Sequence, residues 1–110
     1  MQREFRKYTV DFTNVKYYLE MHAVIRDSLE FPAYYGNNWD ACWDCLKEIA
    51  GEPVHIRIIG MKNIEKRFST SAKHFLDLLK DFKNYDNKKY ADITQIEIID
   101  SQSGKISVLE

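Results

Sequence analysis

The alternation of apolar and polar residues predicts a chain that begins and ends with β-strands. Tyr8, Val10 and Phe12 fall on one side of an extended segment from Glu4 to Phe12, which is typical of a strand with one buried face. Three later segments are rich in β-branched and aliphatic residues and are also predicted to be strands: residues 54–59, 93–99 and 106–109. A turn at residues 100–105 joins the last two as a hairpin.

Between these strands, apolar residues recur every three to four positions, which is the spacing of helices with one buried face. Pro32 ends the first helix, and Asn37 or Asn38 is expected to cap the second. A Ser-Thr-Ser run at residues 69–71 offers an N-cap for the last and longest helix. The predicted helices cover residues 16–29, about 38–50, 63–68 and about 71 onward, the last with Phe75, Leu78, Leu79 and Phe82 buried.

The order of these elements predicts an α/β fold. Helical crossovers connect parallel strands, so we expect a small three-stranded parallel sheet packed by three to four helices. The hairpin adds an antiparallel strand, Ile106 to Leu109, at the C-terminal edge. Because no linker or repeat interrupts the pattern, a single domain over residues 1–110 is predicted.

Charge and composition narrow the class of protein. The 110 residues are 45% hydrophobic and carry a formal net charge of −1, which disfavours a general binder of nucleic acid or of membranes. Six acidic residues and one base lie between Asp27 and Glu52, so the middle of the chain is acidic. We find no signal peptide or membrane-spanning run, and two cysteines fit a reducing compartment, so a cytoplasmic location is expected.

The sequence contains no motif that clearly indicates an enzyme active site. Cys42 and Cys45 form a CxxC pair, but a redox pair needs a helix N-terminus and a zinc site needs two more ligands, so packing cysteines are predicted. The histidines are scattered, and no glycine-rich phosphate loop is present. We therefore predict no catalytic residues, no metal and no cofactor.

The lysines of residues 80–89 alternate with aromatic residues and superficially resemble a nucleic-acid surface. Acidic residues lie among them and cancel most of their field: Asp77, Asp81, Asp86 and Asp92. A solvated helix end is the favoured interpretation.

The run from Tyr34 to Asp44 remains as a candidate binding surface. A purely structural interpretation assigns its asparagines to helix capping and its aromatic residues to the core. This interpretation does not account for the adjacent Tyr34 and Tyr35, because an extended segment or a turn cannot easily bury two neighbouring rings on the same side. Rigid aromatic residues beside the carboxylates of Asp40 and Asp44 are typical of a protein-binding hot spot.

The segment Phe31–Leu46 closely resembles the signature of the barstar family, the intracellular inhibitors of bacterial ribonucleases. The pattern P-x-Y-Y-G-x-N-x-D-A-x-W-D-C-L is matched at every fixed position, and the order of elements is similar from about Tyr8 to Ile99. The resemblance implies that the second helix and the loop before it enter a nuclease active site. Carboxylates on that helix then replace substrate phosphates in a cationic cleft.

The resemblance implies that Asp44 is the central contact with the nuclease and that Asp40 is the second carboxylate of the interface. It also implies that Tyr34 stacks on the catalytic region of the nuclease and that Trp43 packs at the rim. Asp81 falls where the family has an acidic contact on a later helix. The full predicted partner-binding set is Tyr34, Tyr35, Gly36, Asn38, Asp40, Trp43, Asp44 and Asp81.

The implied function is stoichiometric inhibition of a small basic ribonuclease of the barnase type, or immunity against a nuclease toxin as its antitoxin. The expected partner is that nuclease, and the free protein is expected to be a monomer. One alternative stays open, namely a barstar-fold interaction module whose partner is not a nuclease.

Overall fold

The computed structural model describes residues 6–90, 94–100 and 102–109. In these residues the strands are β1 (Arg6–Asp11), β2 (Val54–Ile59), β3 (Thr94–Ile99) and β4 (Ile106–Val108). The helices are α1 (Tyr18–Ser28), α2 (Trp39–Glu48), α3 (Met61–Arg67) and α4 (Ser69–Tyr90).

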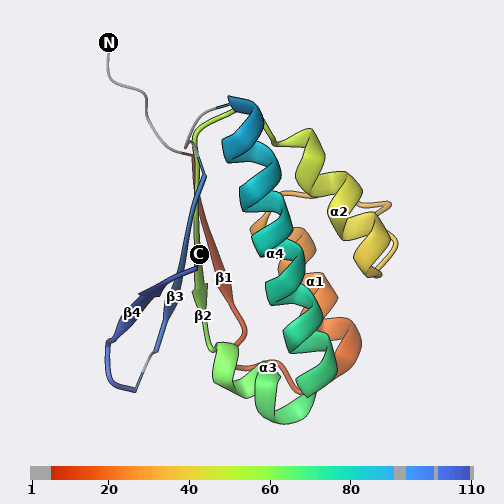
Figure 1. Cartoon of the computed structure of the whole chain (residues 1–110). Coiled ribbons are helices and arrows are strands. Elements are labelled where there is room, and N and C mark those ends of the chain that lie inside the picture. The colour runs from red at the N-terminus through yellow and green to blue at the C-terminus, as the bar shows by residue number, and fades with distance from the viewer. Residues whose placement is uncertain (1–5, 91–93, 101, 110) are drawn as a thin grey trace.

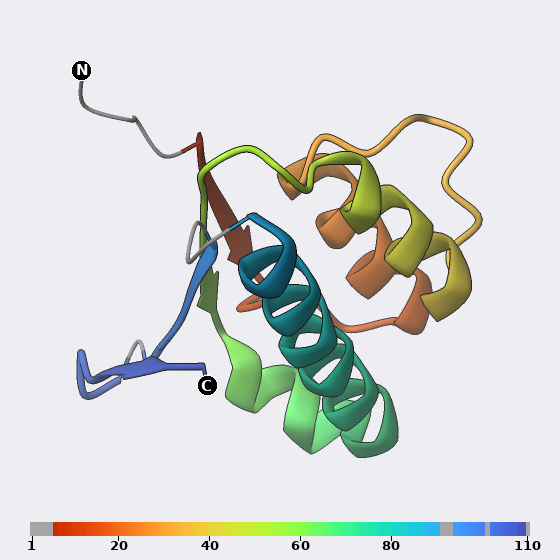
Figure 2. The same ribbon diagram turned by 45° about the horizontal axis from the view of Figure 1, so that its top comes forward.

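The strands form one sheet in the order β1-β2-β3-β4. The first three are parallel, with Tyr8, Ile56 and Ile96 in register, and β4 pairs antiparallel with β3. All four helices of the described chain lie on one face of the sheet (Figures 1 and 2). The predicted fold is confirmed, including the additional C-terminal edge strand.

The core lies between this sheet and the helices. Val10, Ile56, Ile58 and Ile96 point inward from alternate positions of the strands and are completely buried. The four apolar residues that were predicted to form the buried face of α4 are all in the core: Phe75, Leu78, Leu79 and Phe82. The long helix therefore spans the sheet and provides a rigid support for α2, which packs beside it.

Helix boundaries differ from the prediction by a few residues. α3 begins at Met61 rather than at residue 63, because Gly60 adopts φ +78° and turns the chain directly out of β2. A Cβ at Gly60 would lie 2.5 Å from the backbone nitrogen of Thr13, so this close approach requires glycine. Ser69 is the first residue of α4 and not a cap that precedes it.

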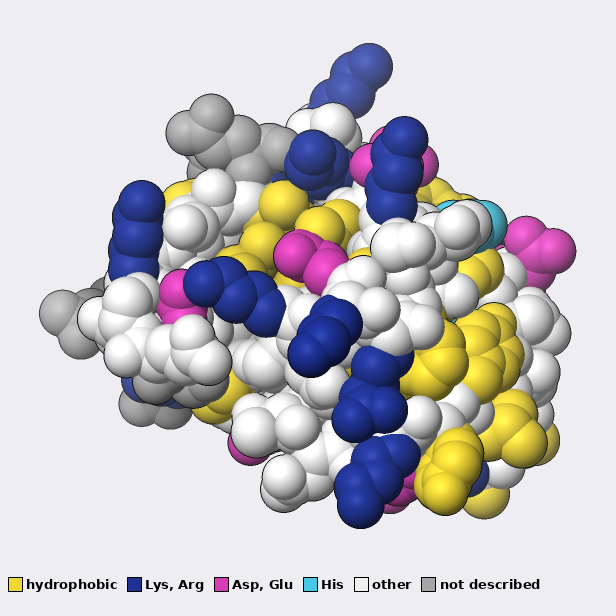
Figure 3. Space-filling view, turned by 90° about the horizontal axis from the view of Figure 1, so that it is seen from below, with side chains coloured by type: hydrophobic (Ala, Val, Ile, Leu, Met, Phe, Trp, Pro, Cys, Tyr) yellow, Lys and Arg dark blue, Asp and Glu magenta, His cyan; other side chains and the backbone are white. Residues whose placement is uncertain are grey.

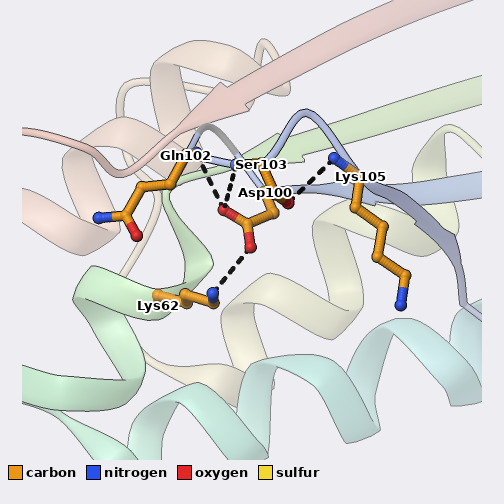
Figure 4. A network of polar contacts seen from close by, with 5 residues as sticks. All are labelled: Lys62, Asp100, Gln102, Ser103 and Lys105. Carbon is orange, nitrogen blue, oxygen red and sulfur yellow. Dashed lines mark hydrogen bonds and ion pairs between the residues drawn. The ribbon is translucent and has the colours of Figure 1, made fainter.

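The C-terminal hairpin is held by Asp100 (Figure 4). Its carboxylate accepts hydrogen bonds from Lys62 Nζ of α3 (2.7 Å) and from the backbone nitrogens of Gln102 (2.9 Å) and Ser103 (3.4 Å). These hydrogen bonds, with the one from Lys62 as the largest cause, lower the pKa of Asp100 to about 2. The hairpin is therefore tied to α3, away from α2.

Asp86 corrects the interpretation of the end of α4 as a wholly solvated surface. Its side chain is completely buried. One carboxylate oxygen accepts a hydrogen bond from the backbone nitrogen of Gly51 (2.9 Å), and the other accepts from the hydroxyl of Thr94. Asp86 thus fastens the segment that follows α2 to both α4 and β3.

Candidate protein-binding site

The side chain of Asn38 fixes the start of α2. Its Oδ1 accepts a hydrogen bond from the backbone nitrogen of Ala41 (2.8 Å), and its Nδ2 donates to the carbonyl of Gly36 (3.1 Å). A Cβ at Gly36 would lie 3.2 Å from that Nδ2, so a larger residue would crowd the cap. The predicted cap is confirmed, and it directs α2 out of the loop at residues 34–38 in a defined orientation.

The helix α2 buries one side and exposes the other. Cys42 and Leu46 are completely buried, whereas Asp40, Asp44 and Glu48 recur every four residues on the exposed side. This is the acidic stripe that the sequence predicts. The carboxylates therefore project from a helix whose backbone is held in place by the core.

The adjacent tyrosines of the preceding loop point in opposite directions. Tyr34 is 81% exposed, while Tyr35 is only 5% exposed and packs against Phe31 with ring centroids 5.4 Å apart. The structure thus separates two residues that the sequence placed in one binding set. Tyr34 is on the surface, and the ring of Tyr35 is in the core beneath it.

His22 of α1 lies completely buried behind this loop, a position that the sequence did not reveal. Its Nδ1 is 2.9 Å from the hydroxyl of Tyr35, and its Nε2 is 3.1 Å from the hydroxyl of Tyr18. The Tyr35 hydroxyl also donates a hydrogen bond to the carbonyl of Asn38 (3.3 Å). The ring centroids of Trp39 and His22 are 4.7 Å apart. One histidine therefore connects α1 to the loop and to the first residues of α2.

We expect protonation of His22 to destabilise the fold. Burial lowers the pKa of His22 below its ordinary value of 6.5, so the unfolded chain takes up this proton at a higher pH than the native chain. The contribution of neutral His22 is therefore present above pH 6.5 and is lost as the pH falls from there through the folded-state pKa. Urea unfolding of wild type and His22→Gln between about pH 5 and pH 8 measures it. The loss at low pH should be smaller in the variant, and identical pH profiles would contradict the assignment.

Lys47 is the nearest cation to Asp44 among the described ion pairs. Its Nζ lies 3.6 Å from Asp44 Oδ1 and 5.9 Å from the centroid of the Trp43 ring. Both side chains are exposed to solvent, so this ion pair contributes little to stability. Asp44 therefore remains accessible to a stronger cationic partner.

A groove runs between α2 and α4 and has a volume of about 420 Å³. Its lining from α2 is Trp39, Asp40 and Trp43. Its lining from α4 is His74, Asp77, Leu78 and Asp81. This α2–α4 groove brings together Asp40, Trp43 and Asp81 of the predicted set, whereas Tyr34 and Asp44 are not part of its lining.

Trp39, His74, Asp77 and Leu78 were not in the predicted partner-binding set. Asp77 precedes Asp81 by four residues, a helical spacing that could have suggested a shared face. Trp39 is half-buried and packs against His74, with 5.4 Å between the ring centroids. The groove depends on how two helices pack, which local periodicity does not specify.

The two cysteines are free and buried within α2, as is typical of cysteines that pack in a core. Burial raises the pKa of Cys42 to about 12, and burial together with the neighbouring carboxylates of Glu48 and Asp44 raises the pKa of Cys45. Neither thiol therefore has the lowered pKa of a redox pair.

We expect iodoacetamide to alkylate both thiols of the folded protein at least about tenfold more slowly than those of the urea-unfolded chain at pH 7.5. The thiolate is the reactive form, and burial disfavours it. Intact-mass spectrometry over time measures the two rates. Similar rates in the two states would contradict the packing role.

The charge of the surface is uneven. Lys and Arg side chains outnumber Asp and Glu on the face seen from below, where α3 lies (Figure 3). Exposed bases of α3 include Lys62, Lys66 and Arg67. The near-neutral net charge of the chain is therefore the sum of an acidic α2 and a basic region elsewhere on the surface.

Within the described residues, no group of three or more His, Cys, Asp or Glu side chains could hold a metal ion. No described helix is long and apolar enough to cross a membrane. The arrangement that the structure does provide is a capped helix with exposed carboxylates, an exposed tyrosine and a groove with aromatic and acidic lining. These features make this surface a candidate protein-binding site.

Comparison with known proteins identifies the family of this chain. Residues 5–96 match the family described as Barstar (barnase inhibitor), so the chain belongs to the barstar family. A segment of 36 residues is 50% identical to "Putative ribonuclease inhibitor YrdF" of Bacillus subtilis (strain 168). That alignment covers 33% of this chain and 36% of the relative, so the chain spans about a third of the relative's length.

Proposed function

We propose that this protein is a stoichiometric inhibitor of a small basic bacterial ribonuclease, or the immunity protein for a nuclease toxin. The observation that carries the proposal is the exposure of Asp40 and Asp44 on one side of α2, beside exposed Tyr34. Membership of a family described as barnase inhibitors supports the same function. The protein itself performs no catalysis in this proposal and needs no cofactor.

Inhibition proceeds by occlusion of the active site. A ribonuclease binds RNA phosphates with cationic side chains, and α2 presents carboxylates at fixed positions without a large ordering cost. Asp44 engages the centre of the cationic cleft, Asp40 a neighbouring cation, and Tyr34 and Trp43 pack at its margin. Gly36 and Asn38 shape the loop, and Asp81 contributes from α4.

Tyr35 acts indirectly in this proposal. Because its ring is buried and its hydroxyl contacts His22 and Asn38, it positions the loop and leaves the contact with the nuclease to Tyr34. The inhibitor acts in the cytoplasm as a monomer and binds one nuclease molecule.

Affinity capture from the source organism tests this proposal. The wild-type protein and an Asp40→Ala/Asp44→Ala variant serve as matched baits, and mass spectrometry identifies the captured proteins. We expect a basic nuclease as the main protein retained by wild type and lost with the variant. A main catch without nuclease activity would instead favour an interaction module with another partner.

A further inference from the structure

A second cleft lies between α3 and the C-terminal hairpin, and its volume is about 220 Å³. Its lining from α3 includes Met61, Lys62 and Glu65, and its lining from the hairpin includes Ile98, Asp100 and Lys105. The hairpin side of this lining lies beyond residue 96, where the match to the barstar family ends. This α3–hairpin cleft is therefore separate from the site described above, and the family match does not account for it.

An ion pair joins the two walls of the cleft. Lys62 Nζ of α3 lies 2.7 Å from Asp100 Oδ2 of the hairpin, and the other carboxylate oxygen of Asp100 accepts from the backbone nitrogens of Gln102 and Ser103 (Figure 4). The hairpin is thus held against α3 before any ligand arrives. A preformed cleft of this kind binds a small ligand without a large ordering cost.

The polar lining leaves Lys105 as a cation that no acidic side chain of the described chain neutralises. Lys62 is already committed, because its hydrogen bond with Asp100 is the largest cause that raises the pKa of Lys62, and Glu65 adds to this effect. Lys105 is exposed, and none of the ion pairs formed among the described residues includes it. Its side chain extends from the turn on the side where Asp100 meets Lys62 (Figure 4). The cleft therefore offers one ammonium group to an anion.

Apolar side chains determine what else the ligand must contain. Met61 is only 3% exposed and Ile98 is half-buried, so together they provide an apolar surface inside the cleft. A phosphate has no apolar part to cover this surface, and the carboxylates of Glu65 and Asp100 repel any second negative charge. The volume is below the roughly 300–1,000 Å³ of pockets for drug-sized ligands. A short aliphatic chain with a single carboxylate meets all three conditions.

We infer that the α3–hairpin cleft binds a small aliphatic monocarboxylate, whose carboxylate lies at Lys105 and whose chain packs on Met61 and Ile98. The ammonium of Lys105 donates charge-assisted hydrogen bonds to the carboxylate, while Lys62 stays bound to Asp100. Because the cleft lies away from α2 (Figure 1), this inference does not depend on the proposed function.

Methyl NMR of the full-length protein tests the inference, because Met61 lines the cleft whereas Met21 is completely buried and outside its lining. Protein with ¹³C-labelled methionine methyl groups is titrated with 4-methylpentanoate at pH 7. The uncharged 4-methylpentanamide is the matched ligand, and inorganic phosphate tests for a general anion site. We expect a saturable shift of the Met61 methyl resonance in the millimolar range, at least about threefold weaker binding of the amide, and no shift with phosphate.

Lys105→Gln removes the charge from the hairpin wall. We expect this variant to bind 4-methylpentanoate at least about threefold more weakly and to bind the amide as wild type does. Lys80→Gln, a substitution of an exposed lysine of α4 outside the cleft, should leave both affinities unchanged. Circular dichroism verifies that both variants fold.

Four results would overturn the inference. They are the absence of a saturable Met61 shift, equal binding of carboxylate and amide, a comparable shift with phosphate, and wild-type affinity for 4-methylpentanoate in Lys105→Gln. None of these measurements involves a nuclease, so the outcome is independent of whether the protein inhibits one.

Discussion

Replacing Asp44 by alanine is expected to weaken binding to a barnase-type ribonuclease by at least about tenfold, or ~1.4 kcal/mol. The carboxylate is exposed in the free protein and only loosely paired with Lys47 at 3.6 Å. In the proposed complex, cations of the enzyme surround this carboxylate and water is excluded, so its removal leaves those cationic groups buried without a partner. The cost of truncation is therefore much larger than that of an exposed ion pair.

Titration calorimetry with Asp44→Ala and wild type measures this difference. Asp27→Ala is the control, because Asp27 is also exposed and pairs with a neighbouring base, Arg26, at 2.9 Å. We expect the control to bind like wild type. A loss of less than about threefold for Asp44→Ala would show that Asp44 is not the central contact.

The second large effect concerns stability. We expect Asp86→Ala to reduce the free energy of unfolding by about 2–3 kcal/mol. The carboxylate accepts hydrogen bonds from the backbone nitrogen of Gly51 and from the hydroxyl of Thr94, and it is completely buried. Alanine leaves both donors without this acceptor and creates a small cavity.

Asp86→Asn is the matched variant for this prediction. Its amide oxygen can still accept from Gly51, and its amide nitrogen can donate to the Thr94 hydroxyl, so most of the stability should remain. Urea unfolding of the three proteins gives the free energies. If Asp86→Ala were as stable as wild type, Asp86 would not anchor the segment after α2.

The agreement between sequence and structure is greatest where local pattern determines the result. Alternation places Tyr8, Val10 and Phe12 inward, and the capping preference of asparagine places Asn38 at the start of α2. These features depend on a few neighbouring residues. The acidic stripe of α2 follows from the same periodicity, and so does the buried face of α4.

The features that the sequence did not reveal arise from contacts between distant segments. Asp86 lies in a largely polar stretch of the sequence, but its contact with Gly51, 35 residues away, makes it a buried acceptor. His22 is buried because Tyr35 and Trp39 pack over it. Asp77 becomes a groove residue only when α4 lies beside α2. No periodic pattern within one element carries this information.

The central claim is that one molecule of this protein occludes the active site of one ribonuclease molecule. The most direct measurement is cleavage of RNA by a small secreted ribonuclease of the barnase type, at fixed enzyme concentration and increasing amounts of this protein. The account predicts that cleavage falls in proportion to the added protein and ceases at a one-to-one ratio. Undiminished cleavage at a micromolar excess would contradict inhibition of this type of ribonuclease.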